Sequence, residues 1–214
     1  MYVGRIVAVG KTPAGANTAL YRVSSRSFPN RQAVAQDGTV AVVPRPGSEA
    51  DVARNPYIAY NALRLVGEWA VAANGSQTDP IAERIAAGMP VRDALALVML
   101  ALDYEKDNYD TPRIAGAVPL RGDSGWLAVV RRDALVVKEV PLTAGRLLYI
   151  ATYEADDVRD SQAGDFSVTT ATEAARFIVD GGLFRGLERP VTSAAAVAGG
   201  EEFGLATHVV QGDG

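Results

Sequence analysis

The densest group of side chains able to bind a ligand is the segment 22–31, RVSSRSFPNR, with three arginines and three serines. So many hydrogen-bond donors cannot satisfy one another, so they must face water or an anionic ligand. The first 36 residues contain five basic residues and no Asp or Glu, whereas the whole chain has a net charge of −4. An acidic protein is not expected to bind nucleic acid along its surface. The segment therefore predicts a loop that binds a small phosphorylated ligand.

A second group is the segment 103–107, DYEKD, at the end of a predicted apolar helix. Acidic residues at a helix C-terminus oppose the helix dipole, so another interaction must favour them. One interpretation is a general acid–base carboxyl group, Glu105, beside a lysine, Lys106, that lowers its pKa or contacts a substrate oxygen. The alternative is a solvated helix end with a charge pair.

Two further motifs carry polar or aromatic side chains next to predicted strands. In NPYIAYN, Tyr57 and Tyr60 are three apart on a predicted strand and so point to opposite faces, which allows one to face a pocket. Packing is the more common role of tyrosine in a sheet. The motif NGSQTD at 74–79 joins a strand to a helix, and its polar groups either form a turn and cap or bind a ligand.

Several kinds of chemistry lack support in the sequence. The chain has no cysteine and a single histidine, His208, which argues against thiolate or multi-histidine metal sites and against a histidine-based triad. A P-loop, a dinucleotide fingerprint and a nucleophile elbow are also absent. No apolar run approaches the length of a membrane span, and there is no signal-peptide pattern. We expect a cytoplasmic protein without a metal or cofactor.

The elements that must position these residues follow from hydrophobic periodicity and turn signals. Strands are predicted over residues 1–10, 18–24, 33–36, 39–44, 57–66, 69–73, 113–120, 126–131, 135–140, 146–153 and 204–210. Helices are predicted over about ten residues from 79, and over 91–104, 170–179 and 191–197. This order favours two sheets packed face to face with helices outside, in one domain spanning 1–214. The helix over 91–104 is apolar almost all round, which predicts cover from the sheet and from another helix or a second subunit.

Five motifs in order along the chain resemble the archaeal IMP cyclohydrolase family: RVSSRSFPNR, NPYIAYN, NGSQTD, DYEKD and TPRIA at 111–115. The similarity runs from the N-terminal MYVGRI to PVTSAAA at 190–196. The resemblance implies an α+β fold, a four-layer αββα sandwich of two mainly antiparallel sheets like that of N-terminal-nucleophile hydrolases. It also implies closure of 5-formamidoimidazole-4-carboxamide ribonucleotide to IMP with loss of water, the last step of purine synthesis. Those hydrolases use Ser, Thr or Cys at residue one, whereas this chain begins Met1-Tyr2, so covalent catalysis is not expected.

For that reaction, the phosphate needs cations and the ring must be held in place. We expect the ribose 5′-phosphate to be bound by Lys11, Arg22 and Arg26. Contacts that hold the carboxamide nitrogen near the formyl carbon are expected from Ser25, Asn74 and Gly75.

The reacting groups need an oxyanion donor and a proton carrier. Arg31, assisted by Tyr60, is our candidate donor to the formyl oxygen. Glu105, with its pKa tuned by Lys106, is our candidate for moving protons from the amide nitrogen to the departing hydroxyl.

Two other functions fit the same residues. One is an amidohydrolase of the same fold that acts on a linear amide. The other is a non-catalytic module that senses purine nucleotides, in which 103–107 is only a helix end. For the enzyme, we expect a purine ribonucleotide substrate and IMP as product, no nucleic-acid or membrane partner, and a homo-oligomer formed through the helix over 91–104.

Overall fold

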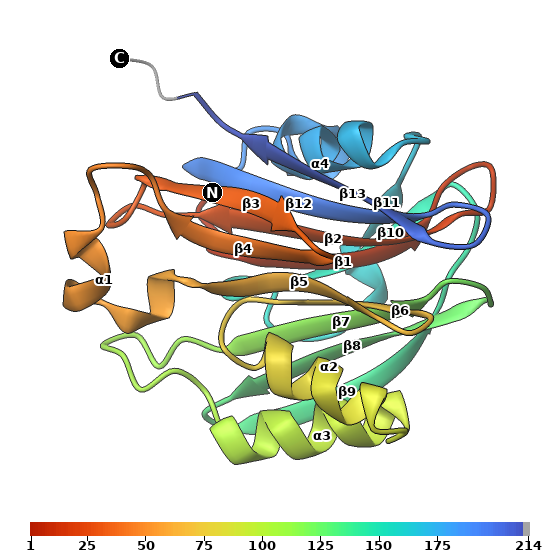
Figure 1. Ribbon diagram of the computed structural model, residues 1–214, viewed down its shortest axis with the longest axis horizontal. Coiled ribbons are helices and arrows are strands. Elements are labelled where there is room, and N and C mark those ends of the chain that lie inside the picture. Colours follow the sequence, from red (N-terminus) through yellow and green to blue (C-terminus); the bar gives the residue numbers. More distant parts are fainter. Residues whose placement is uncertain (212–214) are drawn as a thin grey trace.

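Two antiparallel β-sheets lie face to face in the computed structural model, which describes residues 1–211 (Figure 1). The six-stranded sheet contains, in spatial order, β11 (Ala163–Asp165), β10 (Arg146–Ala151), β1 (Ile6–Lys11), β2 (Asn17–Ser24), β12 (Pro190–Ala198) and β13 (Phe203–Val209). The seven-stranded sheet contains β3 (Arg31–Gln36), β4 (Thr39–Pro44), β5 (Tyr60–Val66), β6 (Trp69–Ala73), β7 (Arg113–Pro119), β8 (Ser124–Arg131) and β9 (Ala134–Pro141).

Helices cover both outer faces of this sandwich. Helix α4 (Ala171–Asp180) packs on the six-stranded sheet, and α2 (Thr78–Ala86) and α3 (Val91–Leu102) pack on the other (Figure 1). The connections contain a short helix α1 (Ala50–Arg54) and the 3₁₀ turns η1 (Pro56–Ile58), η2 (Asp160–Gln162) and η3 (Gly182–Phe184). The layers confirm the predicted α+β sandwich. None of the helices within residues 1–211 is long and apolar enough to cross a membrane.

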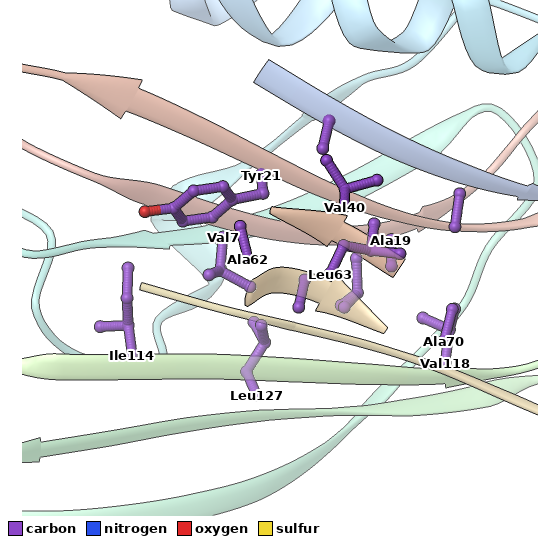
Figure 2. Packing of buried hydrophobic residues seen from close by; sticks show 14 of the residues in the cluster. Val7, Ala19, Tyr21, Val40, Ala62, Leu63, Ala70, Ile114, Val118 and Leu127 are labelled. Carbon is purple, nitrogen blue, oxygen red and sulfur yellow. The ribbon is translucent and has the colours of Figure 1, made fainter. Parts of the chain in front are cut away.

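The main hydrophobic core lies between the sheets. Strands β1 and β2 are buried along their whole length, because one face meets the second sheet and the other lies beneath α4. Figure 2 shows Val7 and Ala19 of the first sheet packed near Leu63 and Leu127 of the second. The Tyr21 ring lies at one end of this cluster, so its hydroxyl marks where the apolar core gives way to polar groups.

The sequence correctly predicted one hairpin turn and one helix cap. Asp37 and Gly38 both have positive φ, 48° and 74°, as a two-residue hairpin turn between β3 and β4 requires. Helix α4 begins with the capping box expected from Thr170 and Glu173, each side chain accepting a hydrogen bond from the other residue's backbone N–H.

The helix predicted over 191–197 is wrong, because this segment forms the inner strand β12, between β2 and β13. Its alanines favour a helix locally, but small side chains suit a strand buried on both faces. Ala194 and Ala196 face the second sheet, whereas Ala195 and Val197 face α4. Tertiary packing therefore outweighs local propensity here.

Three other predictions need correction. The first strand begins at Ile6, not at residue 1. Tyr57 lies in η1 rather than on a strand, because Pro56 precedes it and the Asn55 side chain accepts its N–H at 2.8 Å. Helix α3 ends at Leu102, not at residue 104; it packs on the sheet and against α2, as predicted, and Leu100 on its remaining face is 67% exposed.

Candidate active site

Polar and charged side chains from both sheets meet at one end of the sandwich, the end that carries α1 in Figure 1. Because neighbouring strands are antiparallel, the starts of β1, β3, β5 and β7 lie near the ends of β2 and β6. Side chains at this end are those of Arg5, Tyr21, Arg31, Tyr60, Asn74, Gln77, Glu105 and Arg113. No three His, Cys, Asp or Glu side chains within residues 1–211 are grouped as metal ligands would be.

The centre of the site is a buried ion pair between Glu105 and Arg5. Glu105 is 1% exposed, and its Oε2 accepts a hydrogen bond from Arg5 Nη2 at 2.8 Å. Its other oxygen, Oε1, has no hydrogen-bond partner among the described residues and lies 3.9 Å from Arg113 Nη1. Burial raises the pKa of Glu105 above its ordinary value, and the charges of Arg5 and Arg113 oppose this. Such a carboxyl group can accept and return a proton through its free oxygen.

Glu105 is held by the loop that follows α3. Asp103 ends the helix with φ 56°, and its carboxylate accepts the Tyr104 N–H at 2.9 Å. Asp107 accepts hydrogen bonds from the backbone and hydroxyl of Thr111, and the Glu105 N–H donates to the Thr111 carbonyl at 2.9 Å. These bonds close a compact loop that directs Glu105 inward.

Two tyrosines and a second arginine lie beside this pair. The hydroxyls of Tyr21 and Tyr60 are 2.5 Å apart. Arg31 is 3% exposed; its Nε donates to the Phe28 carbonyl, and its Nη1 has no partner within residues 1–211, like the Nε of Arg5. Burial raises the pKa of Tyr21 well above its ordinary value, although Arg5 and Arg31 act to lower it. The site thus contains buried N–H donors that point at no protein acceptor.

The turn between β6 and α2 forms another wall. The Asn74 side chain accepts hydrogen bonds from Gln77 and from the Ile114 N–H, and donates to the Pro112 carbonyl. A Cβ atom on Gly75 would lie 2.8 Å from Arg113 Nη1, so this backbone approaches the site more closely than any other residue type permits.

Comparison with known proteins gives the family. A family model described as IMP cyclohydrolase-like protein matches residues 2–202. This chain belongs to that family. The resemblance inferred from the five motifs is therefore confirmed.

Relatives named IMP cyclohydrolase match almost the whole chain. The relative from Methanosphaera stadtmanae is 45% identical over 196 residues, which cover 92% of this chain and 94% of the relative. A relative from Methanococcus maripaludis is 47% identical over 208 residues, 97% of this chain and 100% of the relative. One from Natronomonas pharaonis is 48% identical over 204 residues, 95% of this chain and 96% of the relative.

Two residues expected to bind phosphate, Lys11 and Arg22, lie apart from the group of side chains around Glu105. Lys11 is at the far end of β1, where its Nζ binds Asp123 at 2.6 Å and the Gly122 carbonyl at 3.0 Å. Arg22 points to the outer face of its sheet, because successive strand residues alternate and Tyr21 points inward. Its guanidinium donates to carbonyls of Val179 and Leu187, at 2.8 and 2.9 Å.

Lys106 does not lie beside Glu105 as expected. It binds Asp103 at 2.5 Å and lies 3.3 Å from the centre of the Tyr104 ring, with its side chain exposed. Glu105 turns into the protein, whereas Lys106, its neighbour in sequence, turns to solvent. Arg5 and Arg113 are the cations next to Glu105.

Arg26, the second arginine of the segment 22–31, lies at a pocket of about 470 Å³. The pocket is lined by Met1, Tyr2, Arg26, Ser27, Tyr109, Tyr153 and Glu154. The Arg26 guanidinium stacks on Tyr2 at 4.3 Å and pairs with Glu188 at 2.9 Å. Ser25 is buried next to it, and its hydroxyl accepts the Phe28 N–H. Tyr153 joins this pocket to the Glu105 loop, because its hydroxyl lies 2.9 Å from that of Thr111.

Sequence reasoning did not select Arg5, Tyr21, Gln77 or Arg113 as site residues. Arg5 and Arg113 lie within the motifs MYVGRI and TPRIA. An arginine at the end of a buried strand could have indicated that they are site residues. Tyr21 and Gln77 gave no comparable signal, because one lies in an apolar strand and the other in a polar turn.

Proposed function

We propose that this protein is an IMP cyclohydrolase, which closes 5-formamidoimidazole-4-carboxamide ribonucleotide to IMP and water. The observation that carries the proposal is the buried carboxylate oxygen of Glu105, free of partners among residues 1–211, at the same end of the sandwich as the unpaired Nη1 of Arg31. Membership of a family whose relatives bear this enzyme's name supports it.

The chemistry needs one group that moves protons. The carboxamide nitrogen attacks the formyl carbon, a C–N bond forms, and the amide proton passes to Oε1 of Glu105. Glu105 passes this proton to the oxyanion, which becomes the hydroxyl of a ring carbinolamine. The former formamide nitrogen then gives its proton to Glu105 as the C=N bond forms, and Glu105 returns it to the departing hydroxyl, which leaves as water. Glu105 therefore acts first as a base and then as an acid.

The same step places negative charge on the formyl oxygen. We assign its stabilisation to Arg31 Nη1 and to the hydroxyl of Tyr60. Donors fixed before the reaction stabilise a developing oxyanion well, because little reorganisation is needed when the charge forms.

The nucleotide's sugar and phosphate belong, in this proposal, in the pocket beside the site. Its volume of about 470 Å³ is in the range of small-molecule sites. Arg26 is the phosphate ligand, since it lines this pocket, whereas Lys11 and Arg22 bind protein groups in other parts of the molecule. Ser25, Asn74 and Gly75 keep the role of holding the ring in this proposal, and Gly75 would do so through its backbone.

The test is to incubate the protein with the formamido ribonucleotide and follow IMP by its absorbance. Ring closure is expected well above the spontaneous rate. The variant Glu105→Gln should bind the nucleotide but lose roughly 100-fold or more in turnover, because the amide keeps the shape of the side chain and cannot take up the proton.

Two outcomes would favour the other functions. Tight binding of the nucleotide with no acceleration would indicate a nucleotide sensor. Release of formate and the free amine, instead of IMP, would indicate an amidohydrolase.

Three further properties belong to the proposal: a single domain over 1–214, a cytoplasmic location, and a homo-oligomer that needs no nucleic acid. Self-association is supported by the exposed side chains of Leu97, Leu100 and Leu102 on α3. Sedimentation of the wild type against Leu100→Glu tests it, since a monomer in both cases would reject the oligomer.

A further inference from the structure

The two arginines next to Glu105 contact it unequally. Arg5 binds Oε2 directly at 2.8 Å, whereas Arg113 Nη1 stops 3.9 Å from Oε1, too far for a hydrogen bond. A buried carboxylate attracts every cation near it, and guanidinium groups often bind both oxygens. Something must therefore hold Arg113 back.

Two hydrogen bonds hold the Arg113 guanidinium in place. Its Nε donates to the Asp103 carbonyl at 2.9 Å, and its Nη1 donates to Gln77 Oε1 at 3.0 Å. Because the guanidinium is planar and rigid, two bonds on different nitrogens fix its position.

Both acceptors are themselves fixed. Gln77 is fully buried, and its amide donates to Asn74 Oδ1 at 2.7 Å and to the Ile114 carbonyl at 3.2 Å. Asp103 adopts φ 56°, which a non-glycine residue rarely does, and such conformations cluster at functional sites. The acceptors cannot follow Arg113 if it moves toward Glu105.

We infer that Gln77 and Arg113 are positioning residues that keep Oε1 of Glu105 free of a hydrogen bond while leaving a positive charge beside it. The inference rests on the proposed function, because a free Oε1 is the atom that takes the proton from the carboxamide nitrogen. Arg113 stabilises the ionised carboxylate from 3.9 Å without occupying its acceptor site.

The inference predicts pKa changes of opposite sign. The charged groups that face Glu105 are Arg5 before β1, Arg113 on β7 and Asp107 in its own loop. In Gln77→Met, Arg113 loses one anchor and moves onto Oε1, so the Glu105 pKa falls. In Arg113→Gln, a cation is lost and the pKa rises.

The kinetic consequences follow from these signs. The acidic limb of the kcat profile should move to lower pH in Gln77→Met and to higher pH in Arg113→Gln. In Gln77→Met, kcat should fall about tenfold while KM changes by less than threefold, because only the proton acceptor is blocked. Arg113→Lys, which keeps the charge, should retain the wild-type limb better than Arg113→Gln.

The deciding experiment is an NMR titration of the Glu105 carboxyl carbon in protein labelled with ¹³C-glutamate, with the signal assigned by its loss in Glu105→Gln. It reports the pKa directly, whether or not the protein closes the ring. Arg146→Gln, at the far end of the sandwich, is the charge-matched control and should leave the pKa unchanged. If Gln77→Met does not fold, Gln77→Asn withdraws the same acceptor while keeping the amide.

Opposite shifts in the two variants would support the inference. Shifts of the same sign, or none, would overturn it even if the wild type is active. Opposite shifts in a protein that does not form IMP would instead reject the proposed function and leave the positioning intact.

Discussion

The hydroxyls of Tyr21 and Tyr60 lie 2.5 Å apart, one on a strand of each sheet. One of them must donate to the other, and the tyrosine that accepts keeps its own proton to donate elsewhere. If Tyr60 serves the formyl oxygen, then Tyr21 is the donor that orients it.

This pair predicts that Tyr21→Phe lowers kcat by roughly fivefold, the effect of losing about 1 kcal/mol of hydrogen bonding. The ring and its packing remain, so KM and the melting temperature should change little. Steady-state kinetics with a thermal melt checks this. Tyr149→Phe, on the α4 side of the same sheet, is the matched control; an equal loss of kcat there would remove the role assigned to Tyr21.

The buried carboxyl group predicts a pH dependence of activity. Because burial raises the pKa of Glu105, the base form is lost at a pH above the ordinary glutamate range. As pH falls, kcat/KM should therefore decline before exposed carboxylates are protonated. A pH–rate profile at constant ionic strength measures this limb, and a limb at or below the ordinary glutamate pKa would contradict it.

Arg26 and Lys11 are predicted to have different roles: Arg26 binds the phosphate, whereas Lys11 stabilises the fold. Arg26→Gln should raise KM about tenfold with kcat little changed, since a charge-assisted hydrogen bond contributes roughly 1.5–3 kcal/mol. Lys11→Gln should leave KM unchanged and lower the melting temperature, because Lys11 is nearly buried and binds the loop at Gly122. The reverse pattern would restore Lys11 as the phosphate ligand.

The cap of α4 predicts a pH-dependent stability. Hydrogen bonds from Thr169 and Thr170 lower the pKa of Glu173 to about 2 in the folded protein. Its stabilising effect is therefore present above the unfolded pKa and is lost as pH falls from about 4.5 to 2. The difference in melting temperature between wild type and Glu173→Gln should vanish near pH 2. A difference that persists there would rule out the charge as its cause.

Residue types that a fold does not require were the best guide to the site. Arg31 and Glu105 were chosen for that reason, whereas Tyr60 was chosen as a donor that could assist Arg31. All three lie at one end of the sandwich, and their roles stay predictions. The layer order was also predictable, since strand and helix patterns occur in blocks along the chain.

What the sequence could not specify was which way each side chain points. The segment 18–24 is buried on both faces, so it shows no apolar–polar alternation, and nothing local distinguishes Arg22 from Tyr21. Because consecutive strand residues point to opposite faces, Arg22 lies under α4 and Tyr21 points into the site. The direction of the Lys106 side chain likewise depends on the path of its loop. Hydrogen bonds from Thr111 to Asp107 determine that path.

Because the hydroxyls of Tyr21 and Tyr60 join the two sheets, the rate of turnover depends on how closely the sheets pack against each other. A partly unfolded state that keeps its strands but loosens the packing between them would separate the two hydroxyls. Turnover should then disappear while far-ultraviolet circular dichroism still reports intact strands. Activity is in this sense a measure of tertiary order, and it should be the first property lost on mild heating.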